Sequence, residues 1–197
     1  YDWRAQHVKE FEEEILQYKK HGLEFFAFWS VHEEAFRLFE KYKLHPQIWR
    51  TLPSPKADTQ KARVEAAAKA MLPLVERTKK LGCKLGLYNH GGWGGEPTNL
   101  VAVCQYLREH HKAKHVGIVY NLHHGHGHIA DFKQSLKLMQ PYLHCLNLNG
   151  MNEGAQPKIL SLGRGQHEVA MIATIRKSGY SGPIGILDHR NDTDTEI

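Results

Sequence analysis

The chain has 197 residues, 41% of them hydrophobic and 24% charged, a balance typical of a soluble globular protein with one substantial core. Its formal net charge of +5 comes from lysines and arginines scattered over predicted polar helix faces, which argues against nucleic acid as a partner. No apolar stretch approaches the roughly 20 residues of a membrane span. Because the sequence begins at Tyr1 without an initiating Met, it leaves a targeting signal and the compartment open. Cys83, Cys104 and Cys145 lie in apolar runs without CxxC spacing, which predicts buried free thiols.

In chain order, amphipathic helices alternate with short apolar runs. Apolar residues three or four positions apart predict helices in the segments 8–22, 35–42, 64–82, 99–110, 132–143 and 167–177. Continuous apolar runs predict strands in the segments 23–29, 46–52, 83–87, 116–120, 144–148 and 183–187. The helix at 132–143 is expected to carry Phe132, Leu136, Met139 and Leu143 on one face. Repeated units of this kind form a parallel sheet with crossover helices.

Two α/β architectures fit this alternation, a doubly wound sheet and a (β/α)8 barrel of the TIM type. No strand is followed by a GxGxxG or P-loop motif, which disfavours a nucleotide-binding doubly wound sheet. Polar residues end nearly every strand, which favours the barrel. Six units in 197 residues extrapolate to about 250 residues for eight, the usual barrel size. We therefore expect residues 1–197 to form a single TIM-barrel domain from which the first, N-terminal strands are missing.

The segment 116–128 is the most informative stretch of the sequence. It reads Val-Gly-Ile-Val-Tyr-Asn-Leu-His-His-Gly-His-Gly-His, so a buried strand runs into an imidazole-rich loop before the next helix. Barrel enzymes place their catalytic side chains at this point of the βα unit. Similar apolar runs end in polar residues at 83–90, 144–150 and 183–189, which indicates one site formed by several strand ends.

Three parts of the chain resemble the xylose isomerase-like TIM barrels, the sugar phosphate isomerase/epimerase superfamily. The segment 83–90, Cys-Lys-Leu-Gly-Leu-Tyr-Asn-His, is similar to the fifth strand of that family. The segment 116–124 is similar to the sixth strand, which usually ends in Asp-x-x-His. The segment 161–168, Ser-Leu-Gly-Arg-Gly-Gln-His-Glu, with 178–184, resembles the late Gly-x-Gly loop, helix and Gly-Tyr-x-Gly turn before strand eight. The likeness covers most of the chain from about Gly22 onward.

The resemblance implies a barrel that isomerises, epimerises or cleaves sugars or polyols, commonly with a divalent metal held by Glu, Asp, His and Glu at strand ends. This sequence departs from that pattern. Tyr88 stands where the fifth-strand Glu is expected, and Asn121 stands at the sixth-strand Asp. Asn147 and Asn149 occupy a stretch that often reads His-x-Lys-Asp. A carboxylate-rich Mg²⁺ or Mn²⁺ site is therefore not expected.

A histidine-based metal site remains as one hypothesis, because imidazole suits ions such as Zn²⁺, Fe²⁺, Co²⁺ and Ni²⁺. It would hold one divalent ion, Zn, Mn, Fe, Co or Ni, at the ends of several strands. The candidate ligands are His90, His124, His126, Asp188 and His189. The alternative is that no metal is bound and that the histidines contact the backbone or the substrate directly, and the sequence leaves both open.

The main catalytic candidate is His124, which matches the family position and can act as a base near neutral pH. His90 and Tyr88 are the other catalytic candidates. His123 and His128 are expected to pack in the loop or at the helix start. Amides, indoles and arginines suit sugar hydroxyls, sugar faces and anionic groups, so the candidate substrate contacts are Trp49, Arg50, Asn89, Trp93, Asn121, Asn147, Asn149 and Arg164, with Trp29 as a further stacking indole.

The segment 91–95, Gly-Gly-Trp-Gly-Gly, is predicted to be a mobile lid without regular structure, because it is rich in glycine around a central aromatic residue. Our first function hypothesis is a sugar or polyol isomerase, epimerase or lyase that abstracts a proton at a strand-end site, metal-assisted or not. The alternative is a catalytically degenerate barrel that binds carbohydrate or forms one module of a larger carbohydrate-active protein. In both cases the expected partner is a small carbohydrate, and the oligomeric state stays open.

Overall fold

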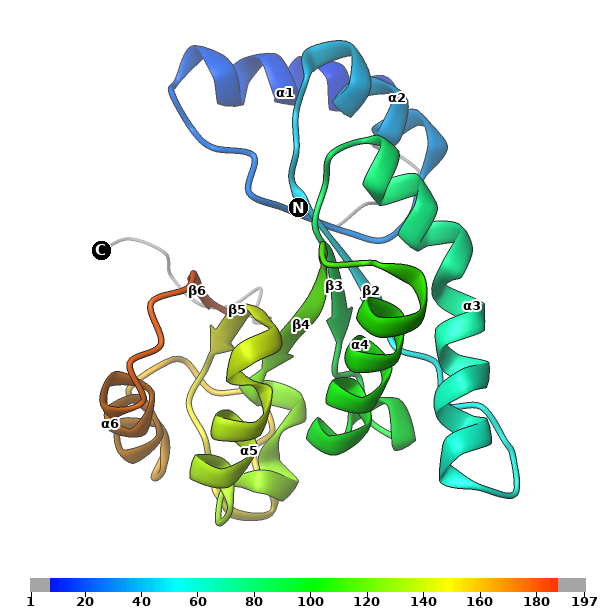
Figure 1. Cartoon of the computed structure of the whole chain (residues 1–197). Coiled ribbons are helices and arrows are strands. Elements are labelled where there is room, and N and C mark those ends of the chain that lie inside the picture. The colour runs from blue at the N-terminus through cyan, green and yellow to red at the C-terminus, as the bar shows by residue number, and fades with distance from the viewer. Residues whose placement is uncertain (1–7, 188–197) are drawn as a thin grey trace.

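The computed structural model describes residues 8–187, whose central feature is one sheet of six parallel strands. The strands pair in the order β1-β2-β3-β4-β5-β6, so each pairs with its neighbour in sequence. In Figure 1 the sheet curls and the helices lie on its outer side. The strands are β1 (Ala27–Trp29), β2 (Gln47–Thr51), β3 (Leu85–Tyr88), β4 (Val116–Asn121), β5 (Leu143–Leu148) and β6 (Ile184–Ile186). The helices are α1 (Phe11–Lys20), α2 (Glu33–Tyr42), α3 (Gln60–Lys80), α4 (Pro97–His111), α5 (Phe132–Met139) and α6 (Glu168–Lys177).

The predicted alternation of helices and strands and the TIM-barrel type of fold are confirmed. Several element boundaries differ from the prediction by a few residues, among them the end of α5. The sequence predicts Leu143 on the apolar face of the helix at 132–143, whereas α5 ends at Met139 and Leu143 opens β5. Pro141 explains the difference, because proline has no N–H and its ring clashes with the carbonyl four residues earlier in a helix. The residues Gln140–Tyr142 form a 3₁₀ turn instead.

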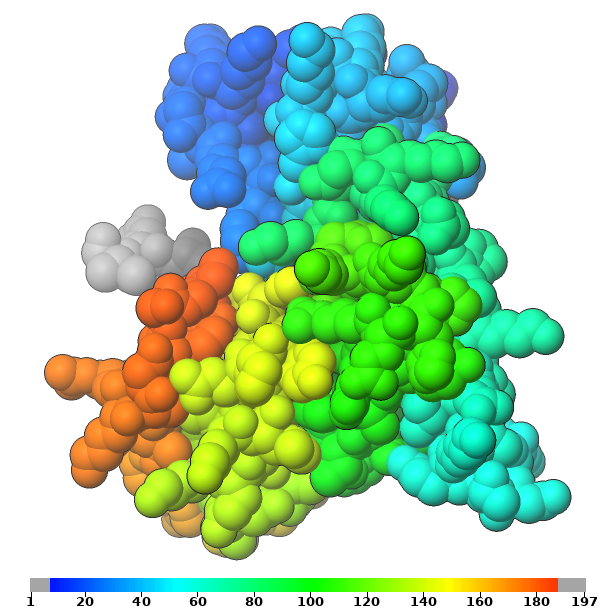
Figure 2. Space-filling view, viewed as in Figure 1, coloured from blue at the N-terminus to red at the C-terminus, as the bar shows by residue number. Residues whose placement is uncertain are grey.

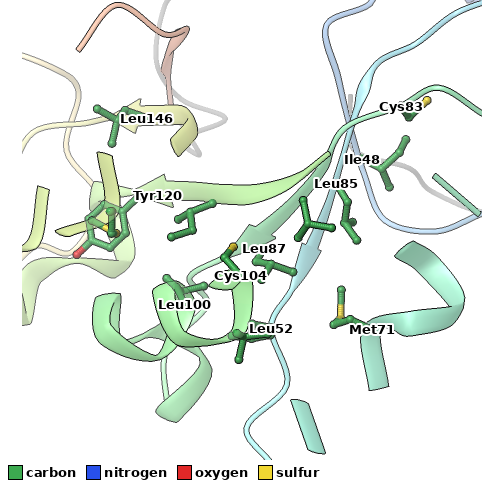
Figure 3. Packing of buried hydrophobic residues seen from close by; sticks show 14 of the residues in the cluster. Ile48, Leu52, Met71, Cys83, Leu85, Leu87, Leu100, Cys104, Tyr120 and Leu146 are labelled. Atoms are coloured by element: carbon green, nitrogen blue, oxygen red, sulfur yellow. The ribbon is translucent and has the colours of Figure 1, made fainter. Parts of the chain in front are cut away.

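The main core lies between the outer face of the sheet and the helices (Figure 3). Leu85 and Leu87 of β3 alternate onto this face and are fully buried. They belong to one apolar cluster with Met71 of α3 and with Leu100 and Cys104 of α4. Burying each leucine side chain contributes roughly 1.5–3 kcal/mol, so this layer supplies most of the driving force for folding.

The inner face of the sheet carries a smaller, aromatic cluster. Its members are Tyr88, Val119 and Cys145, with Phe26, Trp29 and Trp49 packed against them. Gly86 shows how tightly the inner face is filled, because a Cβ at that position would overlap Val119 and lie 3.0 Å from Trp49 Cδ1. The inner face is thus filled by large side chains from several strands, as in a packed barrel interior.

The two edge strands of the described sheet are β1 and β6, and a cavity of about 520 Å³ lies between them. Trp49 and Asn147 line this cavity from the inner face of the sheet. On β6, Ile184 and Ile186 are 50% and 74% exposed, so this edge is not covered within residues 8–187. In Figure 2 the colours follow one another around the molecule from blue through green to orange, as consecutive βα units require.

The three cysteines are free and buried, as the sequence predicts. Burial raises the pKa of Cys83 and of Cys145 to about 11 and that of Cys104 to about 12, so each is a protonated thiol at neutral pH. Within residues 8–187, no helix is both long enough and apolar enough to cross a lipid bilayer.

Candidate active site

Aromatic and imidazole rings from four adjacent segments meet on the inner face near the carboxyl ends of β1 to β4. We call Trp29, Trp49, Tyr88, His90 and His124 the ring cluster. The ring centroids of His90 and His124 are 4.4 Å apart, and those of Tyr88 and His124 are 5.8 Å apart. Trp29 lies edge-on against Tyr88 with a centroid distance of 4.0 Å, and Trp49 lies 6.2 Å from Tyr88. The fold therefore brings together the three side chains predicted to be catalytic and two indoles.

Strand register explains why these rings converge. Trp29 of β1 is the direct partner of Trp49 of β2, and Tyr88 is the last residue of β3. His90 follows Tyr88 by two positions, and His124 ends the 3₁₀ turn Leu122–His124 that follows β4. Because parallel strands end at the same edge of a sheet, residues placed just beyond β3 and β4 become neighbours.

The Tyr88 phenol is the buried acid of the cluster. Burial raises the pKa of Tyr88, and a hydrogen bond from the side-chain amide of Asn121 to its hydroxyl oxygen offsets only part of that effect. The phenol is therefore protonated at neutral pH. A hydroxyl that accepts one hydrogen bond keeps its own proton, so Tyr88 can still donate to a substrate oxygen.

Asn89 joins the ends of β3 and β4. Its side-chain Nδ2 donates to the Asn121 carbonyl oxygen at 3.0 Å, and its Oδ1 accepts from the Asn121 backbone N–H at 2.7 Å. Asn89 and Asn121 are both fully buried. The structure therefore places these two predicted substrate contacts in a structural link, with the Asn121 side chain directed to Tyr88 and to the His123 backbone N–H.

The histidine-rich loop consists of two short 3₁₀ turns, Leu122–His124 and His126–His128, joined at Gly125. A Cβ on Gly125 would lie 2.6 Å from the Tyr120 hydroxyl, so the loop needs glycine there. The His126 Nδ1 lies 3.0 Å from the His123 carbonyl oxygen, and burial lowers the pKa of His126. His126 is therefore a neutral imidazole at neutral pH, and it fixes the loop that presents His124.

Asn147 and Asn149 lie on or just after β5, on the same side of the strand as Cys145. Each has one buried polar atom without a hydrogen-bond partner within the described structure, Nδ2 of Asn147 and Oδ1 of Asn149. Asn147 is 4% exposed and also lines the cavity between β1 and β6. Buried polar atoms are costly unless they are paired, so this donor and this acceptor are suited to a ligand or to water.

Three other predicted contacts, Arg50, Trp93 and Arg164, are not members of the ring cluster. Arg50 is exposed and, by strand alternation, projects from the opposite face of β2 to Trp49. Arg164 is exposed in the loop before α6. Trp93 donates its indole N–H to Gln60 at 3.0 Å and lies under the Arg63 guanidinium at 5.0 Å, so it packs beside α3. Asp188 and His189 lie outside the described residues.

The glycine-rich segment after β3 differs from the sequence-based expectation. Trp93–Gly95 form a 3₁₀ turn, so the expectation of no regular structure is wrong. The Gly94 N–H donates to Ser54 Oγ at 2.9 Å, and a Cβ on Gly94 would overlap the Leu52 carbonyl oxygen. The glycines therefore permit close packing against the loop after β2, and this packing fastens the segment that we expected to be a lid.

The metal hypothesis can be tested against the donors that are present. Within residues 8–187, no three His, Cys, Asp or Glu side chains are arranged to hold an ion. The ring cluster supplies two imidazoles and no carboxylate, whereas protein metal sites of this kind use three or four protein ligands. The described donors therefore do not complete a metal centre.

Sequence reasoning missed the residue that organises the loop after β5. The Glu168 carboxylate, at the start of α6, is fully buried and accepts hydrogen bonds from the backbone N–H groups of Met151 at 3.0 Å and of Gly165 at 2.6 Å. Burial alone would raise the pKa of Glu168, but these donors hold it below its usual range. The available signal was an acidic residue at the last position of the motif at 161–168, where a helix is predicted to begin.

The chain matches no known family model and no curated protein sequence. Its structure is similar to that of a D-tagatose 3-epimerase-like protein, with a TM-score of 0.67 and 16% identity, over 94% of this chain and 77% of that one. The IolI protein with a bound zinc atom gives a TM-score of 0.70 and 10% identity, over 94% and 76% of the two chains. A xylose isomerase domain protein from Planctomyces limnophilus gives a TM-score of 0.66 and 12% identity, over 93% of this chain and 74% of that one. At these identities the likeness establishes the fold, and the chain has the fold of a divergent xylose isomerase-like TIM barrel.

Proposed function

We propose that this protein is a sugar or polyol isomerase or epimerase that works by proton transfer at the ring cluster. The observation that carries the proposal is the placement of His90 and His124, with centroids 4.4 Å apart, beside the buried Tyr88 phenol at the carboxyl ends of β3 and β4. Imidazole is the side chain most often used as a general acid or base, and a protonated phenol can donate a hydrogen bond to a substrate oxygen. The epimerase-like neighbour supports the same class of chemistry.

The proposed reaction begins with one imidazole removing the proton from the carbon next to the substrate carbonyl. We assign this base to His124. The electron pair of that C–H bond forms the double bond of an enediolate, whose negative oxygen accepts a hydrogen bond from the Tyr88 phenol. Return of a proton to the former carbonyl carbon, with transfer of the neighbouring hydroxyl proton to the enediolate oxygen, gives the isomer. Return of a proton to the same carbon from the other face gives the epimer. His90 is the second proton carrier.

Substrate binding is proposed to use the indoles and the β5 asparagines. Trp29 and Trp49 offer flat apolar surfaces on which a sugar face can stack. The unpaired Nδ2 of Asn147 and Oδ1 of Asn149 provide a donor and an acceptor for hydroxyl groups. The preferred substrate is therefore a small polyhydroxylated carbonyl compound.

The test is turnover of a panel of keto-sugars and aldo-sugars by the wild-type protein and by His124→Gln. Loss of a general base lowers kcat by about 10²–10⁴-fold, and we expect the variant to fall in that range. The control is His110→Gln, which changes a histidine that packs on Tyr106 at the end of α4. Equal activity of His124→Gln and wild type would refute the assignment of the base.

Binding of a metal ion is a separate part of the proposal, and the zinc-bound neighbour supports it. His90 and His124 would be its two described ligands, with Asp188 and His189 as further candidates. A bound divalent ion would polarise the substrate carbonyl. Elemental analysis of protein purified without chelator or His-tag tests this, and about one Zn, Mn, Fe, Co or Ni per chain is the result that supports it.

The second candidate function is a carbohydrate-binding barrel without catalysis. The observation that favours it is the lack of any Asp or Glu in the ring cluster, where Tyr88 and Asn121 take the places at which the family carries acids. Saturable binding of a sugar without turnover, unchanged by chelator and abolished by Trp49→Ala, would establish this function instead.

A further inference from the structure

The loops that carry His90 and His124 are tied together at their starting ends. The first loop runs from the end of β3 to Glu96, and the second runs from the end of β4 to Asp131. The Asn89 side chain binds the Asn121 backbone through two hydrogen bonds of 3.0 and 2.7 Å. Beyond this point the two loops leave the sheet, and the separation of the two imidazoles depends on what holds the far ends.

A second link joins the far ends. The His128 Nε2 lies 3.0 Å from Glu96 Oε2, and the His128 Nδ1 lies 3.2 Å from Asp131 Oδ1. Glu96 is the N-cap residue of α4, and Asp131 is the N-cap residue of α5. A carboxylate near a helix N-terminus is favoured by the helix dipole. The His128 ring therefore bridges the starts of two neighbouring helices.

The segment between the two links is short and internally bonded. The Gly125 N–H donates to the Leu122 carbonyl at 2.7 Å, and the His128 N–H donates to the Gly125 carbonyl at 2.9 Å. On the other loop, the Glu96 N–H donates to the Trp93 carbonyl at 3.3 Å. His124 thus lies in a chain of two 3₁₀ turns that is held at Asn121 and at His128.

We propose that His128 is a positioning residue, which sets the spacing of His90 and His124 by linking Glu96 to the histidine-rich loop. The significance of that spacing for catalysis rests on the proposed function, but the link itself does not. His128 itself lies outside the ring cluster, and its ring nitrogens face Glu96 and Asp131. Its partner Asp131 is further fixed by the Ser135 hydroxyl, which lies 3.3 Å from Asp131 Oδ2.

The contacts of the two His128 ring nitrogens can be tested separately by substitution. In His128→Gln the side-chain amide nitrogen reaches about as far as Nε2, so it can keep the bond to Glu96 between the loops. In His128→Asn the shorter amide corresponds to Nδ1, so it can keep the bond to Asp131 and loses the bond to Glu96. Glu96→Ala removes the same link from the other side. The matched control is His167→Gln, because His167 Nε2 lies 3.1 Å from Glu153 Oε1 in a different loop.

The first measurement is backbone hydrogen exchange of the peptides 89–96 and 122–131 without any substrate. We expect His128→Asn and Glu96→Ala to raise exchange in both peptides by about 3- to 10-fold, and His128→Gln and His167→Gln to leave it near the wild-type rate. Equal exchange in His128→Asn and His128→Gln would overturn the proposal. So would an effect of Glu96→Ala that is confined to its own loop.

The second measurement is the steady-state kinetics of the same variants on whichever sugar the wild-type protein turns over. Misplaced catalytic groups lower kcat more than they raise KM, so His128→Asn is expected to lower kcat about 10-fold with KM within about 2-fold, and His128→Gln to restore kcat. Changed exchange with unchanged kcat would overturn the positioning role while leaving the link intact. If the wild-type protein has no turnover, the proposed function fails and the exchange result still decides whether the link exists.

Discussion

Tyr88 shows how a single residue can change the chemistry of a strand end. It is the last residue of β3, and its phenol accepts a hydrogen bond from Asn121. A phenol and an amide carry no charge at neutral pH, whereas a carboxylate carries one negative charge. The site is therefore better suited to donating hydrogen bonds to a developing oxyanion than to neutralising a dication.

The Tyr88→Phe variant tests this role of the phenol. It keeps the ring that packs on Trp29 and removes only the hydroxyl. We expect kcat to fall about 10²-fold because one hydrogen-bond donor to the enediolate is lost. The free energy of unfolding should fall by only about 1 kcal/mol, since Asn121 loses one partner. An unchanged kcat would show that Tyr88 is structural.

His144, at the opposite end of β5 from the site, makes the stability of the protein depend on pH. Burial lowers the pKa of His144 from its ordinary value to about 4, and its Nε2 lies 3.0 Å from the His115 carbonyl. The folded state therefore holds a neutral imidazole while the unfolded chain takes up a proton below about pH 6.5. The stability that His144 contributes is fully present above pH 6.5 and is lost as the pH falls towards 4.

Denaturant unfolding between pH 7.5 and about 4 measures this effect. We expect the wild-type protein to lose up to about 3 kcal/mol of unfolding free energy from this group as the pH falls from 6.5 to about 4. His144→Gln cannot titrate and should lose less over the same range, whereas His110→Gln should follow the wild type. Parallel curves for His144→Gln and wild type would contradict the assignment.

At the scale of an element, the loop after β5 is held by one buried carboxylate. Glu168 accepts hydrogen bonds from the N–H groups of Met151 and Gly165, which lie at the two ends of that loop. Asn149 precedes the loop directly, so its orientation depends on the same contacts. The first turn of α6 thereby helps to fix one of the proposed sugar contacts.

Glu168→Gln tests this dependence with little change of shape. It removes the charge and keeps only one side-chain oxygen, so the backbone N–H of either Met151 or Gly165 loses its acceptor. We therefore expect a loss of about 2–3 kcal/mol of unfolding free energy. Sugar affinity should fall as well, because Asn149 is less well held. Thermal unfolding and sugar titration of Glu168→Gln and of the surface variant Glu109→Gln give the comparison. A stability equal to wild type would show that the loop is held by other contacts.

The elements could be predicted because their signal is local. Apolar spacing located the six α-helices and six strands of residues 8–187 to within a few residues. Pro141 was the visible reason that α5 ends at Met139 and not at Leu143. Side-chain partners depend on contacts between distant segments, which no local pattern contains. Asn89 was predicted to bind substrate and instead holds the Asn121 backbone, and the glycine-rich turn at Trp93 is fixed by Ser54 and Gln60.

At the scale of the whole molecule, the sequence predicted the convergence of Tyr88, His90 and His124 through the order of the strands. A parallel sheet with neighbouring strands in sequence order must bring the ends of β3 and β4 together. Strand order does not place Arg50 in the cluster, because side chains alternate along β2 and Arg50 projects from the opposite face to Trp49. Topology thus predicts which segments meet, and the alternation of side chains along each strand decides which of them lie on the inner face of the sheet.

The central claim is that the ring cluster moves a proton on and off a sugar carbon, and solvent exchange measures this step directly. The protein is incubated in D₂O with each keto-sugar, and proton NMR follows the signal of the hydrogen next to the carbonyl. We predict that the wild-type protein replaces this hydrogen with deuterium for at least one sugar, and that His124→Gln slows the replacement by about 10²-fold or more. Binding of a sugar with no replacement of its hydrogen by deuterium, in wild type and variant alike, would contradict the account.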